Sequence, residues 1–305
     1  MLNKVTSFYK LYVPIDLDLL MTYSSDVPSC FGTPDGFHHL CDGYIAEVPT
    51  DKIYHIVDGN EMFYTMTNIP DTFEDIGLQL LQSQKNKKFL IFSTDNYVEG
   101  STRSSELRRR AGMAEPQVLV LSGEKMRRPE DFKLFLQCPE NKIAFSKLLL
   151  KNWSSEKAAP LIKDQHVCLI VKGKFYKLNS TDGSAVTATE IEEFFSNQEE
   201  SDTRMVLYLQ YIWNLDEKAI VLTLSPDSDV FMLLLLYACN NSMTLYLDTG
   251  SGDSRRMIDI SSLVEDLGHD YCKSLLGIYV FTGEDTKGQG KIRPLKKLQE
   301  NPEYL

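Results

Sequence analysis

The sequence lacks any long hydrophobic run. Its longest unbroken apolar stretch, Val230–Cys239, has ten residues, whereas a helix needs about 20 to cross a bilayer. The amino-terminal segment MLNKVTSFYK also lacks the apolar centre of a secretory signal. We therefore expect a nuclear or cytoplasmic protein that does not contact a membrane.

Cysteine is sparse, and its spacing indicates no disulfide framework. The six cysteines are residues 30, 41, 138, 168, 239 and 272. Without a secretory signal, they are expected to be free thiols in a reducing compartment. Cys30, His38, His39 and Cys41 fit no common spacing of zinc ligands, so no zinc site is expected.

Positive charge is also in deficit. The chain has 32 Lys and Arg against 43 Asp and Glu, which gives a net charge of −11. Because binding to phosphates requires Lys and Arg, any binding to nucleic acid has to come from local basic patches. The 305 residues, 43% of them hydrophobic and 25% charged, are typical of a globular protein with one large domain or two modest ones.

Apolar strands alternate with helices along most of the chain. The predicted strands are Ile53–Val57, Phe89–Phe92, Gln117–Leu121, Val167–Val171, Lys174–Leu178, Ile220–Leu224 and Thr244–Leu247. The predicted helices are Asn60–Met66, Thr72–Gln84, Asn141–Trp153, Thr187–Phe195, Ser201–Trp213, Val230–Ala238, Ile260–Leu267, Cys272–Phe281 and one that begins over Gly290–Gln299. This alternation and the almost wholly apolar strands predict an α/β fold with a mostly parallel central sheet flanked by helices.

Acidic residues follow several predicted strands directly. Asp58 and Asp95 each lie just past a strand, and Asp227 and Asp229 lie in VLTLSPDSDVF, between a strand and a helix. One aspartate in such a place is commonly a turn or helix-capping residue. Since capping a helix needs one side chain, the second aspartate indicates a different task.

Further acids occur at Glu200 and Asp202, where a helix starts, and at Asp285. In open α/β sheets, ligands bind beyond the carboxyl ends of the strands, so we expect these acids to gather at one edge. Gathered carboxylates repel one another unless cations compensate, and their oxygens suit Mg²⁺ or Mn²⁺. Two such ions can activate a water at a phosphodiester and stabilise the leaving oxygen.

The order of these seven acids resembles the active-site series of the flap endonuclease / XPG-type nuclease family, in the PIN-like domain superfamily. The acids are Asp58, Asp95, Glu200, Asp202, Asp227, Asp229 and Asp285. The stretches that carry the resemblance are HIVDGNEMFY, FLIFSTDNYVEGSTRSSELRRRAG, EESDTRMVLYL, SPDSDVF and LLGIYVFTGEDTKGQGK. Asp202 stands where the family has a second glutamate.

The resemblance implies a PIN-like fold over residues 51–305, with a helical arch-like insertion at about residues 96–199. Residues 1–50 precede it as a segment of unassigned role. It also implies that the seven acids hold two Mg²⁺ or Mn²⁺ ions. The implied activity is hydrolysis of nucleic acid, DNA rather than RNA, by a monomer that cuts flaps, loops or ends.

Two groups of basic residues are expected at the substrate. The first group, Arg103 and Arg108–Arg110, resembles the family's basic residues that orient the scissile phosphate, with Arg103 and Arg109 the catalytic pair. A solvated helix face explains this group equally well. The second group is expected to contact backbone phosphates, aided by amides of a glycine turn; it consists of Lys287, Lys291, Arg293, Lys296 and Lys297. A solvated helix near the carboxyl terminus explains this group about as well.

Two other functions stay open. One is a catalytically inactive PIN-like module that binds nucleic acid or protein. The other is a haloacid-dehalogenase-like phosphatase with Asp227 as nucleophile and Asp229 as acid/base, which leaves Asp58, Asp95, Glu200 and Asp285 without a task. Serine chemistry has no support, because Ser225 precedes Pro226 and has no paired histidine. A phosphate loop at Gly283–Gly288 has none either, because Gln289 stands where lysine is required.

Overall fold

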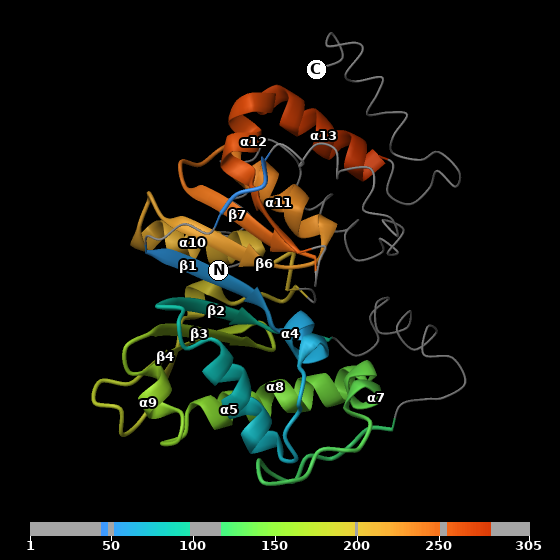
Figure 1. Ribbon diagram of the computed structural model, residues 1–305, viewed down its shortest axis with the longest axis vertical. Coiled ribbons are helices and arrows are strands. Elements are labelled where there is room, and N and C mark those ends of the chain that lie inside the picture. Colours follow the sequence, from blue (N-terminus) through green and yellow to red (C-terminus); the bar gives the residue numbers. More distant parts are fainter. Residues whose placement is uncertain (1–43, 48–51, 98–116, 199–200, 251–254, 282–305) are drawn as a thin grey trace. The chain divides into compact units, whose positions relative to one another are not determined.

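The computed structural model describes residues 44–47, 52–97, 117–198, 201–250 and 255–281 (Figure 1). The chain forms two compact units. The larger unit is Pro49–Pro226, and the smaller unit combines Met1–Val48 with Asp227–Leu305. Within the described ranges, no helix is both long and apolar enough to cross a membrane.

A mostly parallel sheet forms the centre of the larger unit. Its strands, in spatial order, are β5 (Thr187–Glu190), β4 (Lys174–Asn179), β3 (His166–Val171), β2 (Phe89–Ser93), β1 (Ile53–Asp58) and β6 (Ile220–Leu224). Neighbours among β3, β2, β1 and β6 pair in parallel, while β4 and β5 are antiparallel additions. The carboxyl ends of four strands therefore lie at one edge of the sheet.

Helices cover both faces of this sheet, as the apolar strands require. On β2, Phe92 meets Trp153 of α8 (Pro139–Trp153), with ring centroids 5.2 Å apart. Phe89 and Ser93 have the opposite parity in the strand, and both face α10 (Met205–Leu215). The main apolar core lies on the α8 side, where the remaining helices are α4 (Gly59–Thr65), α5 (Phe73–Ser83), α7 (Phe132–Gln137) and α9 (Ala159–Ile162).

The smaller unit is built from helices around a two-stranded antiparallel ladder. Its described elements are α11 (Ser228–Ala238), β7 (Thr244–Thr249), β8 (Arg256–Asp259), α12 (Ile260–Leu267) and α13 (His269–Phe281). A salt bridge of 2.6 Å between Arg255 and Asp248 ties the two strands. Ile45 forms a β-bridge to Ile258, so part of the first 50 residues pairs with β8.

Most predicted elements are confirmed. The hairpin of β3 and β4 turns through Lys172 and Gly173, both with positive φ (53° and 73°), which is the geometry of a two-residue hairpin turn. The described cysteines are free thiols. The expected arch-like range 96–199 also contributes β3, β4 and β5 to the sheet; the arch itself stays a prediction.

The predicted strand Gln117–Leu121 is wrong. The segment is irregular, with Val118 and Val120 exposed while Leu119 and Leu121 pack against the core. The Asn141 side chain accepts from the Leu119 amide at 2.7 Å and donates to the Gln117 carbonyl at 3.1 Å. Side-chain hydrogen bonds thus take the place of a neighbouring strand.

The predicted helix Thr187–Phe195 is also wrong. Thr187–Glu190 forms strand β5 against β4, and only Glu192–Phe194 turns, as a short 3-10 helix. The predicted helix Ser201–Trp213 is displaced, since it begins at Met205 and ends at Leu215. Strand β8 and helices α7 and α9 were not predicted, and Gly290–Gln299 lies outside the described residues.

Candidate metal site at the carboxyl ends of the parallel strands

Strands β1 and β2 place the first two predicted acids side by side. Asp58 is the last residue of β1, and its partner in the parallel ladder is Ser93, the last residue of β2. Asp95 follows two residues later. Asp58 is half-buried and Asp95 is 8% exposed, so both carboxylates have lost much of their hydration.

Backbone amides hold the Asp58 carboxylate. It caps the amino terminus of α4, where its Oδ1 accepts from the amides of Asn60 at 2.9 Å and Glu61 at 3.4 Å. The residue between, Gly59, packs so closely on β2 that an added Cβ would collide with the Phe92 ring and lie 2.7 Å from the Ser93 carbonyl oxygen. The sequence DGN thus brings a helix start directly onto the end of the neighbouring strand.

Asp95 accepts hydrogen bonds from donors in different segments of the chain. The Tyr97 hydroxyl donates to its Oδ2 at 2.9 Å, and the Ser201 amide donates to its Oδ1 at 3.0 Å. A buried ammonium, that of Lys142, lies 4.5 Å from the Tyr97 ring centroid. A cation on the ring face is attracted to the phenol, so it supports Tyr97 in its place beside the carboxylate.

The two carboxylates share one electrostatic environment. Burial raises the pKa of Asp58 to about 7, and the charge of Asp95 adds to the rise, while the amides of Asn60 and Glu61 oppose it. Glu61, which the sequence argument did not single out, adds a smaller repulsion. Near neutral pH, Asp58 therefore exchanges a proton readily, and a bound cation can take the place of that proton.

Asp202 lies in the turn that leads into α10. It is half-buried, its Oδ1 accepts from the Thr203 amide at 2.8 Å, and its carbonyl accepts from the Met205 amide at 2.9 Å. Its neighbour Ser201 is the residue whose amide binds Asp95. That hydrogen bond fastens the Asp202 turn to the segment that follows β2.

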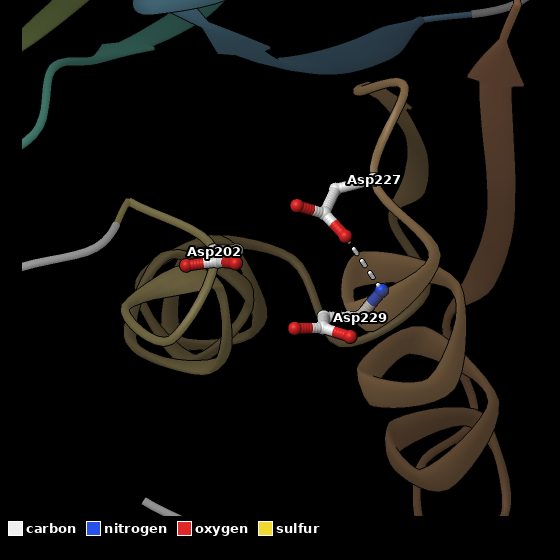
Figure 2. A group of neighbouring side chains, drawn as sticks. All are labelled: Asp202, Asp227 and Asp229. Carbon is white, nitrogen blue, oxygen red and sulfur yellow. Dashed lines mark hydrogen bonds between the residues drawn. The ribbon is translucent and has the colours of Figure 1, made fainter. Parts of the chain in front are cut away.

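Asp227 and Asp229 lie together at the start of α11, in the smaller unit. The Asp227 Oδ1 accepts from the Asp229 amide at 2.9 Å and caps the helix (Figure 2). Asp227 is exposed, and Asp229 is half-buried. Asp227 is therefore the residue that caps this helix, because the helix begins at Ser228, two residues before the predicted start.

The other predicted site residues lie outside the part of the chain that the structure describes. These are Glu200, Asp285, Arg103, Arg108, Arg109, Arg110, Lys287, Lys291, Arg293, Lys296 and Lys297. Their roles stay predictions from the sequence. Comparison with known proteins adds no assignment, since no family model, no curated protein and no solved structure matches this chain.

The candidate metal ligands at this edge of the sheet suit a hard divalent cation. All of them are carboxylate oxygens, the ligands that Mg²⁺ and Mn²⁺ prefer. The Oδ1 of Asp58 is engaged by two amides, whereas its Oδ2 accepts no hydrogen bond from any described residue. Asp58 and Asp95 therefore have the chemistry to act as metal ligands, with Asp202 held near the Ser201–Asp95 hydrogen bond.

Proposed function

We propose that the chain is a nuclease that hydrolyses phosphodiester bonds with the help of Mg²⁺ or Mn²⁺. The observation that carries the proposal is the pair Asp58 and Asp95, two carboxylates fixed at the ends of adjacent parallel strands. Holding such a pair together costs free energy unless a cation offsets the repulsion. A divalent ion supplies that offset.

Asp58, Asp95, Glu200 and Asp202 hold one ion in this proposal, and Asp227, Asp229 and Asp285 hold a second. When bound, the ions supply an activated water and stabilise the leaving oxygen. Asp227 is three residues beyond the end of β6, which limits its distance from that strand end to about 11 Å by chain length alone. Strand β6 pairs with β1, the strand that ends in Asp58.

The basic groups would bring the substrate to the acids. Arg103 and Arg109 orient the scissile phosphate, with Arg108 and Arg110 beside them. The second group contacts the backbone of nucleic acid further along; it consists of Lys287, Lys291, Arg293, Lys296 and Lys297. Because phosphodiesters are common to DNA and RNA, the choice of DNA rests on the family resemblance alone.

A cleavage panel tests the proposal. Flap, hairpin and single-stranded DNA and single-stranded RNA would each be incubated with Mg²⁺, with Mn²⁺ and with EDTA. We expect cleavage that needs the metal, and we expect Asp58→Asn and Asp227→Asn to abolish it while binding persists. Asp259→Asn is the matched control, because Asp259 also caps a helix, accepting from the Ser262 amide at 2.9 Å.

The other outcomes identify the alternatives. Metal-independent binding without cleavage of any substrate would favour an inactive binding module. An aspartyl-phosphate trapped on Asp227 with a fluoride analogue would favour a phosphatase. Cleavage by Asp227→Asn at the wild-type rate would contradict the nuclease assignment.

A further inference from the structure

The larger unit contains a fully buried arginine that the sequence argument did not use. Arg204 lies in the turn before α10 and is 1% exposed. Its guanidinium donates from Nη2 to the Thr94 carbonyl at 2.6 Å. Thr94 directly precedes Asp95, so this bond places a permanent positive charge next to the segment that carries a buried carboxylate.

The hydroxyl of Tyr208, in helix α10, lies at the end of β2. It forms a buried hydrogen bond of 2.7 Å with Ser93, the ladder partner of Asp58. Burial raises the pKa of Tyr208, Arg204 opposes the rise, and Asp95 and Asp58 add to it. The pKa of the Tyr208 hydroxyl is therefore affected by Arg204 and by both carboxylates.

Each of these charges would be costly alone. A buried arginine cannot lose its proton, so it needs nearby negative charge or several hydrogen bonds. The carboxylates of Asp58 and Asp95 need nearby positive charge. The hydrogen bonds from Arg204 to the Thr94 carbonyl and from the Ser201 amide to Asp95 bring the turn that carries Arg204 to the segment that carries Asp95.

We propose that Arg204 is the internal counter-cation of the acidic site. In the metal-free protein it offsets the charge of Asp95 and thereby keeps the turn 201–204 against the end of β2. It is a positioning residue, because it acts through the carboxylates. It also cancels one negative charge that a divalent ion would otherwise meet, so it sets how tightly the site binds metal.

A purely structural role is the competing explanation, and Arg128 supplies a matched control. The Arg128 guanidinium donates to the carbonyls of Ile69, Pro70, Pro129 and Glu130. It fastens loops through carbonyl hydrogen bonds, as Arg204 does at Thr94, and none of these partners is a carboxylate. The counter-cation role predicts that the effect of Arg204→Met depends on the charge at Asp95.

The first test is a double-mutant cycle on unfolding in EDTA. Arg204→Met should lower the folding equilibrium constant. Adding Asp95→Asn to this variant should raise the constant again by at least tenfold, because the buried carboxylate that has lost its counter-charge is then removed. Arg128→Met combined with Asp95→Asn should show additive effects. If Arg204→Met does not fold, recovery of folding in Arg204→Met/Asp95→Asn supports the proposal, and failure of both contradicts it.

The second test is Mn²⁺ affinity, measured by calorimetry on the folded variants. The metal-affinity part of the inference rests on the proposed function. Arg204→Met should bind Mn²⁺ about tenfold more tightly, whereas Arg204→Lys, which keeps the charge, and Arg128→Met should bind as wild type does. Equal Mn²⁺ affinity in Arg204→Met and wild type would contradict this part.

The two proposals fail in different ways. Absence of Mn²⁺ binding in wild type and in every variant would overturn the metal site of the proposed function, while the cycle in EDTA would still decide the role of Arg204. Additive effects of Arg204→Met and Asp95→Asn would overturn the counter-cation role whatever the metal result. If Arg204→Lys lowered the folding equilibrium constant in EDTA as much as Arg204→Met does, the counter-cation role would also be overturned. Lysine keeps the positive charge, so the charge would then not matter.

Discussion

Asp58 is the last residue of β1 and Asp95 lies two residues past the end of the neighbouring parallel strand β2; burial, and then the charge of Asp95, raise the Asp58 pKa to about 7. The strand register fixes this relationship, because Asp58 pairs with Ser93 and Asp95 follows two residues later. Two further contacts hold the pair in place. Gly59 packs closely on the end of β2, and the Ser201 amide donates a hydrogen bond to Asp95.

Stability in EDTA should fall as pH rises from about 4 to about 7. The folded protein keeps a proton on the Asp58 carboxyl up to pH about 7, whereas the unfolded chain releases it near pH 4. The contribution is therefore fully present below pH 4 and is lost as pH passes 7. Asp58→Asn should remove this loss and be more stable than wild type at pH 8, by about 2 kcal/mol.

Thermal melts of wild type and Asp58→Asn at pH 5 and pH 8 measure this effect. Asparagine is as good a helix cap as aspartate, so the hydrogen bonds from the Asn60 and Glu61 amides are retained. Asp131→Asn is a suitable control, because Asp131 caps α7 through the Leu134 amide at 2.8 Å and is exposed. Parallel pH profiles for wild type and Asp58→Asn would contradict the raised pKa.

Millimolar Mn²⁺ should raise the melting temperature of the wild-type protein. A ligand that binds only the folded state stabilises it in proportion to the logarithm of its concentration over Kd, about 2.7 kcal/mol at 100 times Kd. Asp58→Asn and Asp227→Asn should each reduce the rise, whereas the capping control Asp259→Asn should show it in full. An identical melt with and without Mn²⁺ would count against the metal site.

Gly59→Ala should destabilise the protein by about 1–3 kcal/mol, the usual cost of overpacking a buried position. The new Cβ would collide with the Phe92 ring and with the Ser93 carbonyl oxygen, and the backbone there cannot move without disturbing the end of β2. Gly123→Ala is the control, since nothing lies within 4 Å of the position of its Cβ. Chemical denaturation of both variants compares them, and equal stability would show that α4 can shift away from β2.

Sequence reasoning found the parallel core because its signal is local. Apolar runs such as Phe89–Phe92 are buried on both faces, and the acids that follow them are visible as breaks in the pattern. The pairing of Asp58 with Asp95 then follows from one rule, that parallel strands end at the same edge. No long-range contact has to be known in advance.

The errors occur where a distant side chain decides the structure. The alternation in Gln117–Leu121 indicates a strand, yet its backbone is bound by Asn141, which lies 22 residues after Leu119. Strand β5 has all four residues exposed, so it carries no hydrophobic period. Arg204 was overlooked for the same reason, because its burial depends on Thr94, 110 residues earlier in the chain.

The salt dependence of nucleic-acid binding should be shallow and should depend on metal. With a net charge of −11, attraction has to come from local basic groups and from ions that neutralise the carboxylates. Each phosphate contact contributes about 0.9 to the logarithmic salt slope on duplex DNA and about 0.7 on single strands. Changing Lys291, Lys296 and Lys297 to Ala should therefore weaken binding and flatten the slope.

Fluorescence anisotropy over a salt series, in Mn²⁺ and in EDTA, measures these slopes. A triple variant of Lys85, Lys133 and Lys147 to Ala is the control, because it removes the same charge from exposed lysines of the larger unit. Arg103→Ala and Arg109→Ala should instead reduce cleavage more than binding, since their proposed task is to orient the phosphate. Tight, steeply salt-dependent binding in EDTA, or equal slopes for the two lysine triples, would contradict this account of substrate binding.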